Sequence, residues 1–372
     1  MTSRRLGVAR ALVDGVFVAG DVAVDGDEVA AVGLPPARGD RIAAPGLVDA
    51  QVNGFAGVDL MTADEAAVRE IGRTLTRYGV TAWLPTLNTA AAAETDRAVK
   101  ELAKALAAGP GDGSAKPLGV HLEGPYLSPQ RLGTHPAAHR RAPDTDEMRR
   151  WRGLGPVVAV TLAPELPGAI DLIRELSAGG VRVFAGHSDA TNEQAHAGFD
   201  AGAIGVTHLF NATSHLHHRR PGLPGAALAR PDIALGLIVD GYHLAADTVR
   251  VVFAAAPGRV LLVTDATAAA GRPDGTYELA GVRLDVRDGA VRNPEGSLAG
   301  SALTLDAAVR NACELGIDPA TALSAATEAP ARALARPDLG RLRVGRSADV
   351  VVLSDDMRVT DTFVAGGHAT GS

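Results

Sequence analysis

Hydrophobic residues fall into short runs along this chain, separated by segments with a different spacing. Eight runs lie between residues 47 and 265, and most are joined by helix-like segments such as Ala63–Tyr78 and Thr95–Ala108. Helices are the usual crossovers between parallel strands, so the pattern predicts an α/β fold, specifically a TIM-like (β/α)8 barrel. The eight expected strands are Leu47–Asn53, Val80–Thr86, Leu118–Glu123, Val157–Leu162, Val181–His187, Ala203–His208, Ala234–Asp240 and Arg259–Asp265.

The two ends of the chain alternate polar and apolar residues as β-strands do. Near the N-terminus, Asp25-Gly26 separates two such stretches and predicts a hairpin turn, and the alternation returns from Ala348 onward. We therefore expect a small β-sandwich domain formed by residues 1–45 and 340–372, with the barrel occupying residues 46–339.

One segment inside the barrel region departs from the strand–helix pattern. Tyr277–Arg292 alternates polar and apolar residues and contains an Asp288-Gly289 turn signal. The sequence therefore predicts a β-hairpin, near residues 276–293, inserted after the eighth strand.

Composition narrows the class of protein. The 372 residues are 46% hydrophobic and 21% charged, as in ordinary globular enzymes, and the net charge of −7 without a basic block disfavours nucleic acid as a partner. No run approaches the ~18 apolar residues of a membrane span, and the N-terminal stretch is too short and too acidic for a secretory signal, so we expect a cytoplasmic protein. The single cysteine, Cys313, excludes an internal disulfide and a thiolate metal cluster.

Two of the predicted strands stop at a histidine. His187 and His208 end consecutive apolar runs 21 residues apart, about the length of one strand–helix–strand unit. Both imidazoles should then lie at the carboxyl ends of neighbouring strands, where barrels build their active sites. A single strand-end histidine is more often a packed or capping residue, but two at one edge predict a metal site.

Carboxylates end two further strands. Glu123 shares the inward face of its strand with His121, and an inward carboxylate at a barrel mouth is costly unless it is paired or binds a cation. With His187 and His208 it makes a set suited to a divalent metal that keeps a position open for water. Asp265 is then expected beside that water as a general base, although capping of the next helix is the alternative.

The number of metal ions follows from two absences in the sequence. Binuclear barrel hydrolases commonly carry His-X-His on the first strand, where this chain has Gln51-Val52-Asn53, and residues 157–165 offer no lysine for a bridging carbamate. We expect one divalent ion per subunit. Zinc is the expected ion, and iron, cobalt or manganese would accept the same ligands.

These residues lie in motifs that resemble the amidohydrolase superfamily, in particular its single-metal branch that deacetylates N-acetyl amino-sugar 6-phosphates. Each motif alone is a weak indication of the family, but their order along the chain is specific to it. The resemblance covers nearly the whole length of the chain. In chain order they are Pro45–Asp49, Gln51–Gly54, His121–Pro125, Gly133–His135, Gly186–Ser188, Thr207–Ala212, Arg219–Gly222, Asp240–His243, Val263–Thr267 and Leu298–Ser301.

The resemblance implies roles for individual residues. It implies metal ligation by Glu123, His187 and His208, acid–base catalysis by Asp265, and contact of His135 with the acetamide carbonyl. It also implies that the sugar phosphate is bound by Thr134, His135, Asn211, Ala212, Arg219, Asp240, His243, Leu298, Ala299 and Gly300.

The resemblance also implies a homodimer in which one arginine reaches the phosphate in the neighbouring active site. Arg219 and Arg220 are consecutive, and the spacing to Pro221 favours Arg219. Thr213 stands where the family usually has methionine, and we expect it to alter the floor of the pocket. His215, His217 and His218 in the same loop are interpreted as solvent-facing residues, with an accessory metal site as the alternative.

The expected reaction is metal-dependent hydrolysis of the acetamide of N-acetyl-D-glucosamine 6-phosphate to glucosamine 6-phosphate and acetate. An alternative substrate is N-acetylgalactosamine 6-phosphate or a related N-acetyl amino-sugar phosphate. A non-catalytic sugar-phosphate sensor is a different alternative, which an intact ligand set with Asp265 disfavours because a sensor needs no base.

Overall fold

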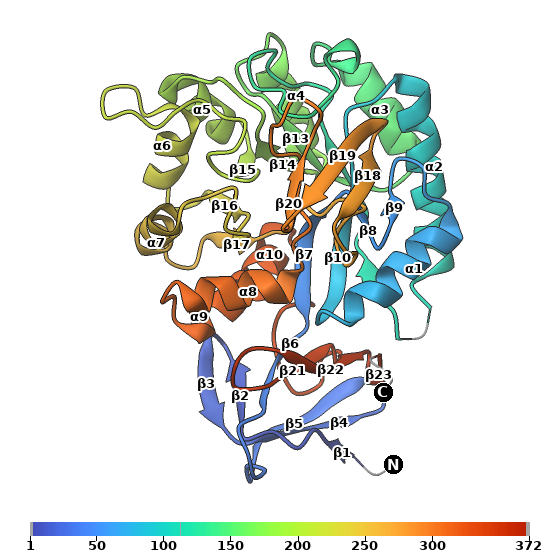
Figure 1. Ribbon diagram of the computed structural model, residues 1–372, viewed down its shortest axis with the longest axis vertical. Coiled ribbons are helices and arrows are strands. Elements are labelled where there is room, and N and C mark those ends of the chain that lie inside the picture. Colours follow the sequence, from blue (N-terminus) through green and yellow to red (C-terminus); the bar gives the residue numbers. More distant parts are fainter. Residues whose placement is uncertain (1–2, 112, 370–372) are drawn as a thin grey trace.

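The computed structural model describes residues 3–111 and 113–369, and eight parallel strands within them form a nearly closed barrel (Figure 1). The strands follow one another around the barrel in chain order. A parallel bridge between Val52 and Ala266 joins the first strand to the segment after the last. The predicted (β/α)8 barrel is confirmed. Its strands are β7 (Leu47–Val52), β10 (Val80–Leu87), β12 (Val120–Glu123), β13 (Val157–Leu162), β14 (Arg182–Ala185), β15 (Ala203–Val206), β16 (Ala234–Leu237) and β17 (Val260–Leu262).

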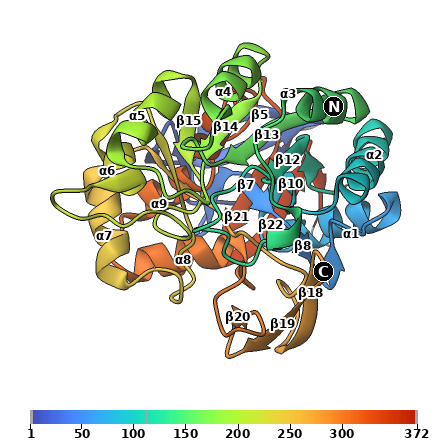
Figure 2. The ribbon, with the colours of Figure 1, turned by 90° about the horizontal axis from the view of Figure 1, so that it is seen from above.

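Helices surround the barrel, as the view along its mouth shows (Figure 2). α1 illustrates why they form: the Asp64 side chain caps its N-terminus, and Val68, Ile71 and Leu75 bury one face at helical spacing. The helices are α1 (Glu65–Thr76), α2 (Ala92–Ala108), α3 (Thr145–Leu154), α4 (Ala169–Ala178), α5 (Asn192–Asp200), α6 (Gly222–Ala229), α7 (Ala246–Ala255), α8 (Leu305–Glu314), α9 (Pro319–Ala325) and α10 (Glu328–Ala333), with a 3₁₀ turn at Ala137–His139.

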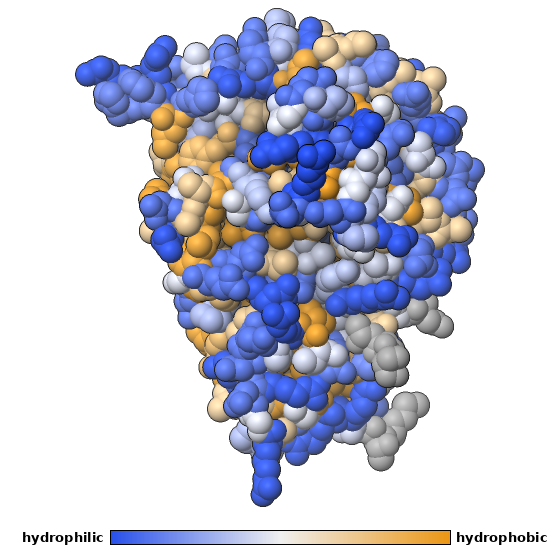
Figure 3. Space-filling model, viewed as in Figure 1, coloured by the Kyte–Doolittle hydropathy of each residue, from blue (hydrophilic) through white to orange (hydrophobic). Residues whose placement is uncertain are grey.

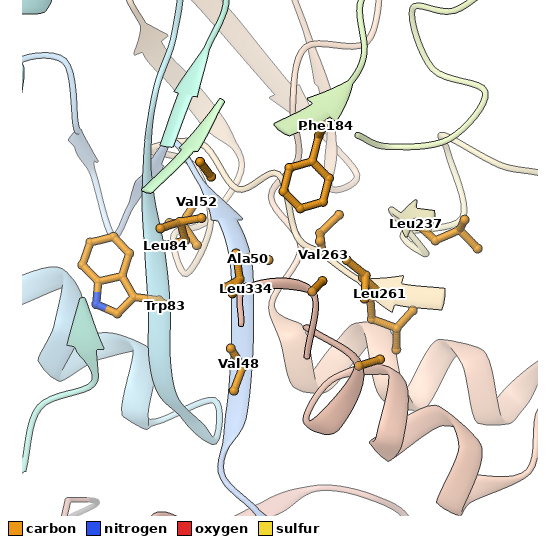
Figure 4. Close-up of a cluster of buried hydrophobic side chains, with 14 of the residues drawn as sticks. Val48, Ala50, Val52, Trp83, Leu84, Phe184, Leu237, Leu261, Val263 and Leu334 are labelled. Atoms are coloured by element: carbon orange, nitrogen blue, oxygen red, sulfur yellow. The ribbon is translucent and has the colours of Figure 1, made fainter. Parts of the chain in front are cut away.

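The main hydrophobic core joins the barrel strands to the helices. Figure 4 shows side chains from β7, β10, β14, β16 and β17 gathered with Leu334, which follows α10. The two largest buried side chains are Trp83 and Trp151, and Trp151 donates a hydrogen bond to Asp96 (2.8 Å). Burial on this scale supplies the main driving force for folding and holds the strand ends in place.

Both ends of the chain build two sheets below the barrel, one antiparallel and one mixed, in which β2 and β6 pair in parallel (Figure 1). One sheet has the order β1-β4-β5 and the other β23-β22-β21-β6-β2-β3, with a separate apolar cluster that includes Val22, Val350 and Phe363. The predicted β-sandwich domain is confirmed, while its exact limits stay a prediction; residues 1–2 and 370–372 lie outside the described residues. The strands are β1 (Arg4–Arg5), β2 (Arg10–Val13), β3 (Val16–Ala19), β4 (Asp21–Asp25), β5 (Glu28–Leu34), β6 (Ile42–Pro45), β21 (Val350–Leu353), β22 (Val359–Val364) and β23 (Gly367–His368).

The insertion after the eighth strand has three strands, so the predicted two-stranded hairpin was incomplete. β18 (Gly275–Leu279), β19 (Val282–Arg287) and β20 (Ala290–Arg292) form an antiparallel sheet. Its two turns, Ala280-Gly281 and Asp288-Gly289, have positive φ at both residues, as tight hairpin turns require. Ala280 is an unusual residue for such a turn, and the sequence pattern therefore did not reveal it. Shorter pairs elsewhere are β8 (Gly54–Phe55) with β9 (Val58–Asp59), and β11 (Lys116–Pro117) with β10.

The surface seen in Figure 3 is largely hydrophilic, including the loop before α6 that projects at the upper left. Within the described ranges, every helix is too short or too polar to span a lipid bilayer.

Asp49 in β7 is a fully buried carboxylate. Its Oδ2 accepts a hydrogen bond from the Thr264 hydroxyl (2.7 Å), and its Oδ1 accepts from the backbone N–H groups of Thr264 and Gln51 (both 3.3 Å). Burial raises the pKa of Asp49 to about 7, because the charged form is poorly solvated there.

Replacing Asp49 by asparagine should therefore make stability less dependent on pH. Below its folded pKa of about 7 Asp49 keeps a proton that the unfolded chain has already released, so its contribution to the unfolding free energy falls as pH rises through this window. An amide has the shape of the protonated carboxyl and does not ionise. Relative to the wild type, the unfolding free energy of the variant should rise by up to ~4 kcal/mol between acidic and mildly alkaline pH, because each unit of pKa shift corresponds to about 1.36 kcal/mol. Urea unfolding of both metal-loaded proteins at several pH values measures this, and a difference that is the same at every pH would contradict it.

Candidate active site

A cavity of about 310 Å³ opens at the carboxyl ends of the barrel strands. Figure 2 views the molecule from this end, with the β18–β20 insertion at one side. Barrel enzymes place their active sites at this end, and the cavity has the size of a small-molecule site. The predicted residues that line it are Glu123, Thr134, His135, His187, His208, Asn211, Ala212, His243, Asp265, Leu298 and Gly300.

Three polar residues of this wall have unusual backbone conformations. His187, His208 and Asp265 have φ values of 47°, 29° and 50°, a region that residues other than glycine rarely occupy. β14, β15 and β17 accordingly end two or three residues earlier than the sequence pattern predicted, at Ala185, Val206 and Leu262. Backbone strain of this kind is concentrated at functional sites, where the surrounding fold maintains it.

Glu123, His187 and His208 bring three ligand atoms together. The two histidine Nε2 atoms are 3.1 Å apart, and they lie 3.3 Å and 3.2 Å from Glu123 Oε1. All three residues are buried. The cluster could bind a metal ion, as the sequence predicted.

The protonation of His187 supports this interpretation. Its Nδ1 lies 2.9 Å from the backbone carbonyl of Arg131, which can only accept, so Nδ1 carries the ring proton. The lone pair of Nε2 is then directed at His208 and Glu123. His187 Nε2 and Glu123 Oε1 are then two acceptor atoms that face each other, and they repel unless a cation lies between them. The donor set therefore fits a divalent metal.

His135 lies beside this cluster. Its Nε2 is 3.8 Å from Glu123 Oε2, and Glu123, His135 and His187 also offer ligand atoms within 4.8 Å of one another. The Thr89 backbone N–H donates to Nδ1 (3.3 Å), which leaves the ring proton on Nε2, the atom nearer Glu123. Burial lowers the pKa of His135 to about 3. His135 is therefore a neutral hydrogen-bond donor at physiological pH.

Asp265 is held by two amides from the first strand. Gln51 Nε2 and Asn53 Nδ2 both donate to Asp265 Oδ1, at 2.9 Å and 2.6 Å. Gln51 Nε2 also donates to Glu123 Oε1 (3.0 Å), so one amide links the two carboxylates. Burial and then the Glu123 charge raise the pKa of Asp265 to about 6. With Oδ1 occupied by two donors, Oδ2 is the oxygen left to exchange a proton.

Gly300 lies behind Asp265 in a conformation that favours glycine, with φ of 54°. A Cβ atom there would lie 2.9 Å from the Asp265 carbonyl oxygen and 2.6 Å from Thr267 Cγ2. A larger residue at this position would push against the segment that carries Asp265.

Other predicted site residues lie outside the cavity wall. Asp240 accepts a hydrogen bond from His243 Nδ1 (2.7 Å) and so orients that cavity residue. The Ala299 side chain packs in the apolar cluster of the insertion. Thr213 is buried and does not line the cavity, so its expected effect on the pocket floor stays a prediction.

Arg219 and Arg220 lie on the exposed loop before α6 and do not line the cavity of their own chain. His215, His217 and His218 are exposed on the same loop. Leu216, also in this loop, has half of its surface exposed, at 50%. The loop therefore places two cations and one apolar side chain away from the barrel wall.

Sequence reasoning missed several residues of the cavity wall. Asn88 follows the second strand by one residue, so the search for polar residues at strand ends could have found it. Arg131, Leu279 and Ala280 come from a loop and from the insertion, where no periodic pattern points to the cavity. His121 was predicted to share the inward face of its strand with Glu123, but it does not line the cavity. Both of its ring nitrogens contact threonines, Thr86 (3.2 Å) and Thr161 (2.8 Å).

An α/β barrel with a buried carboxylate–dihistidine cluster and a nearby aspartate is typical of metal-dependent hydrolases. Residues 42–368 match the amidohydrolase family. The chain therefore belongs to this family and is an enzyme.

Characterised relatives share most of the chain. It is 41% identical over 324 residues to N-acetylgalactosamine-6-phosphate deacetylase of Escherichia coli O157:H7, covering 86% of this chain and 85% of the relative. It is 38% identical over 321 residues to N-acetylglucosamine-6-phosphate deacetylase of Vibrio furnissii, covering 85% and 80%. A mutant N-acetyl-D-glucosamine-6-phosphate deacetylase of Mycobacterium smegmatis, solved in complex with N-acetyl-D-glucosamine-6-phosphate, superposes with a TM-score of 0.93 at 32% identity over the full length of both chains.

Proposed function

We propose that this protein hydrolyses the acetamide of N-acetyl-D-glucosamine 6-phosphate to glucosamine 6-phosphate and acetate. The observation that carries the reaction type is the convergence of Glu123, His187 and His208 beside Asp265 in one cavity. The substrate class is supported by relatives that deacetylate amino-sugar phosphates and by the ligand bound to the Mycobacterium smegmatis protein.

Glu123, His187 and His208 would hold the metal, for which we propose zinc. A divalent ion there would polarise the acyl carbonyl and make water a stronger acid. Gln51 would hold the Glu123 carboxylate in position, because its amide donates to Oε1 and cannot accept a proton from it.

Asp265 would accept a proton from the attacking water through Oδ2 and then deliver it to the departing nitrogen. This transfer matters because an unprotonated amine is a very poor leaving group. Gln51 and Asn53 fix the carboxylate through Oδ1, so the free oxygen is presented in one orientation. His135 would donate from Nε2 to the carbonyl oxygen as negative charge develops there, a contribution of roughly 3–4 kcal/mol for a well-placed donor.

The sugar phosphate would lie over the ends of β15 and β16. Asn211 and Ala212 follow β15, and His243, held by Asp240, follows β16. Thr134, Leu298 and Gly300 complete this wall, with the Thr134 hydroxyl 3.5 Å from the Leu298 carbonyl. The backbone of Ala299 would contribute between them.

We propose that Arg219 binds the phosphate in the neighbouring subunit of a homodimer. Its loop projects from the barrel and does not reach the cavity of its own chain. An exposed Leu216 beside it is suited to a protein contact, and a guanidinium suits phosphate because it donates two parallel hydrogen bonds. Cytoplasmic localisation stays a prediction from the N-terminal sequence.

N-acetylgalactosamine 6-phosphate is the second candidate substrate, favoured by the 41% identity to an enzyme named for it. Acetate release from the two epimers, with the unphosphorylated sugars as controls, tests the proposal. We expect the glucosamine derivative to give the larger kcat/KM. Faster turnover of the galactosamine derivative would reassign the substrate, and binding without acetate release would support the sensor alternative.

A further inference from the structure

His187 is the better supported of the two histidines proposed to bind the metal. Its Nδ1 lies 2.9 Å from the Arg131 carbonyl oxygen, and its own carbonyl accepts a hydrogen bond from the Ser128 N–H (2.8 Å). Nδ1 of His208 is buried and has no hydrogen-bond partner in the described part of the chain. The orientation of the His187 ring therefore depends on the position of the loop that carries Ser128 and Arg131.

The Arg131 side chain returns to the segment that follows His187. Its Nε donates a hydrogen bond to Asp189 Oδ1 (2.7 Å), two residues after the histidine. Arg131 thus contacts this segment twice, through its carbonyl at the His187 ring and through its guanidinium at Asp189. The second contact prevents the loop from pivoting about the first, so it helps to keep the carbonyl against the ring.

Asp189 is itself held from the neighbouring strand. Glu165, in the loop after β13, accepts hydrogen bonds from the Asp189 N–H through Oε1 and from the Ser188 hydroxyl through Oε2, both at 2.7 Å. These contacts fix the two residues that follow His187, whose φ of 47° must be maintained by its surroundings. Asp189 is therefore a firm anchor for the Arg131 guanidinium.

We propose that Asp189, acting through Arg131, is a positioning residue for His187 and sets the affinity of the site for its metal ion. This inference rests on the proposed function, in which Glu123, His187 and His208 hold the metal. Asp189 does not line the substrate cavity, whereas Arg131 does, so the effect of Asp189 must pass through Arg131. Loss of the partner that orients a histidine ligand typically weakens metal binding by about 10–100-fold.

The test is the dissociation constant for Zn²⁺, measured by competition with a chromophoric chelator on protein first stripped of metal. Asp189→Ala should raise this constant by ~10-fold or more, because the Arg131 carbonyl is no longer held against the ring. Asp189→Asn should restore most of the affinity, since its amide oxygen can still accept from Arg131 Nε. Glu175→Ala is the matched control: it removes the same charge and an ion pair with Arg149 (2.8 Å) on the outer helices, and it should leave the constant unchanged.

Arg131→Met separates positioning from simple electrostatics. Loss of the Asp189 charge alone would weaken zinc binding by leaving the Arg131 charge unbalanced, and removal of that arginine would then strengthen zinc binding. If Arg131 instead positions its own carbonyl, Arg131→Met should weaken zinc binding by about as much as Asp189→Ala, although the carbonyl itself is retained. The double variant should show little further loss, because both substitutions break the same contact.

A wild-type zinc constant in both Asp189→Ala and Arg131→Met would overturn the inference about Asp189 and leave the proposed function standing. Tighter binding by Arg131→Met, or equal losses in Asp189→Asn and Asp189→Ala, would overturn it in favour of electrostatics. Arg131→Met and Asp189→Asn decide the question even if Asp189→Ala does not fold. Failure of the wild-type protein to bind Zn²⁺ would overturn the proposed metal site, and the proposed function with it.

Discussion

Replacing Asp265 by asparagine is expected to lower kcat by ~10²–10⁴-fold while the metal content stays near that of the wild type. The amide oxygen can still accept the hydrogen bonds from Gln51 and Asn53, so the local geometry should survive. What is lost is the ability to take a proton from water and return it to the amine. Steady-state kinetics with elemental analysis of the same preparation measure both quantities.

Retention of most of the turnover by this variant would mean that another group is the base. His121, on the third barrel strand β12, is the other residue that could be suspected from the sequence. The structure argues against it, because both ring nitrogens contact threonine hydroxyls and burial lowers the pKa of His121 to about 4. His135 would then be the next residue to replace.

Replacing Arg219 by alanine is expected to raise KM for the phosphorylated sugar by ~10–100-fold, since a hydrogen bond to a charged group contributes roughly 1.5–3 kcal/mol. The effect on the unphosphorylated sugar should be small, so the discrimination between the two should collapse. Arg220→Ala is the matched control from the same exposed loop. A larger loss in the Arg220 variant would move the phosphate contact to that residue.

Mixing Arg219→Ala with Asp265→Asn subunits tests whether the contact crosses a subunit interface. Heterodimers should regain activity, because one of their sites combines an intact base with the neighbour's intact arginine. Absence of recovery despite demonstrated subunit exchange would mean that the phosphate is bound within one chain.

Much of the fold could be predicted because a barrel repeats one simple pattern. Each of the eight apolar runs contains a strand, and β21 and β22 both lie in the alternating stretch predicted from Ala348 onward. The errors have local causes. The predicted strands that end at His187 and His208 are too long, because the positive φ of each histidine ends the hydrogen-bonded strand pairing before it. Hydropathy carries no information about φ. The turn at Ala280-Gly281 lacks the usual asparagine or aspartate, so β18 was not separated from β19.

The candidate site could be predicted where its residues lie at the end of a strand or shortly after it, as Glu123, His187, His208 and Asp265 do. Residues contributed by loops have no such signal. Arg131 orients His187 through a backbone carbonyl, which any residue type would supply. The shared donation by Gln51 to Glu123 and Asp265 depends on three strands meeting, which only the folded barrel reveals.

Acetate release during stepwise return of Zn²⁺ to the chelated protein tests the central claim most directly. N-acetyl-D-glucosamine 6-phosphate should give almost no acetate without metal, and the rate should rise to a plateau at about one equivalent per chain. His187→Ala and His208→Ala should not recover at the same metal concentration. Full-rate acetate release from the metal-free protein, or a plateau reached only at about two equivalents, would contradict a single catalytic metal held by Glu123, His187 and His208.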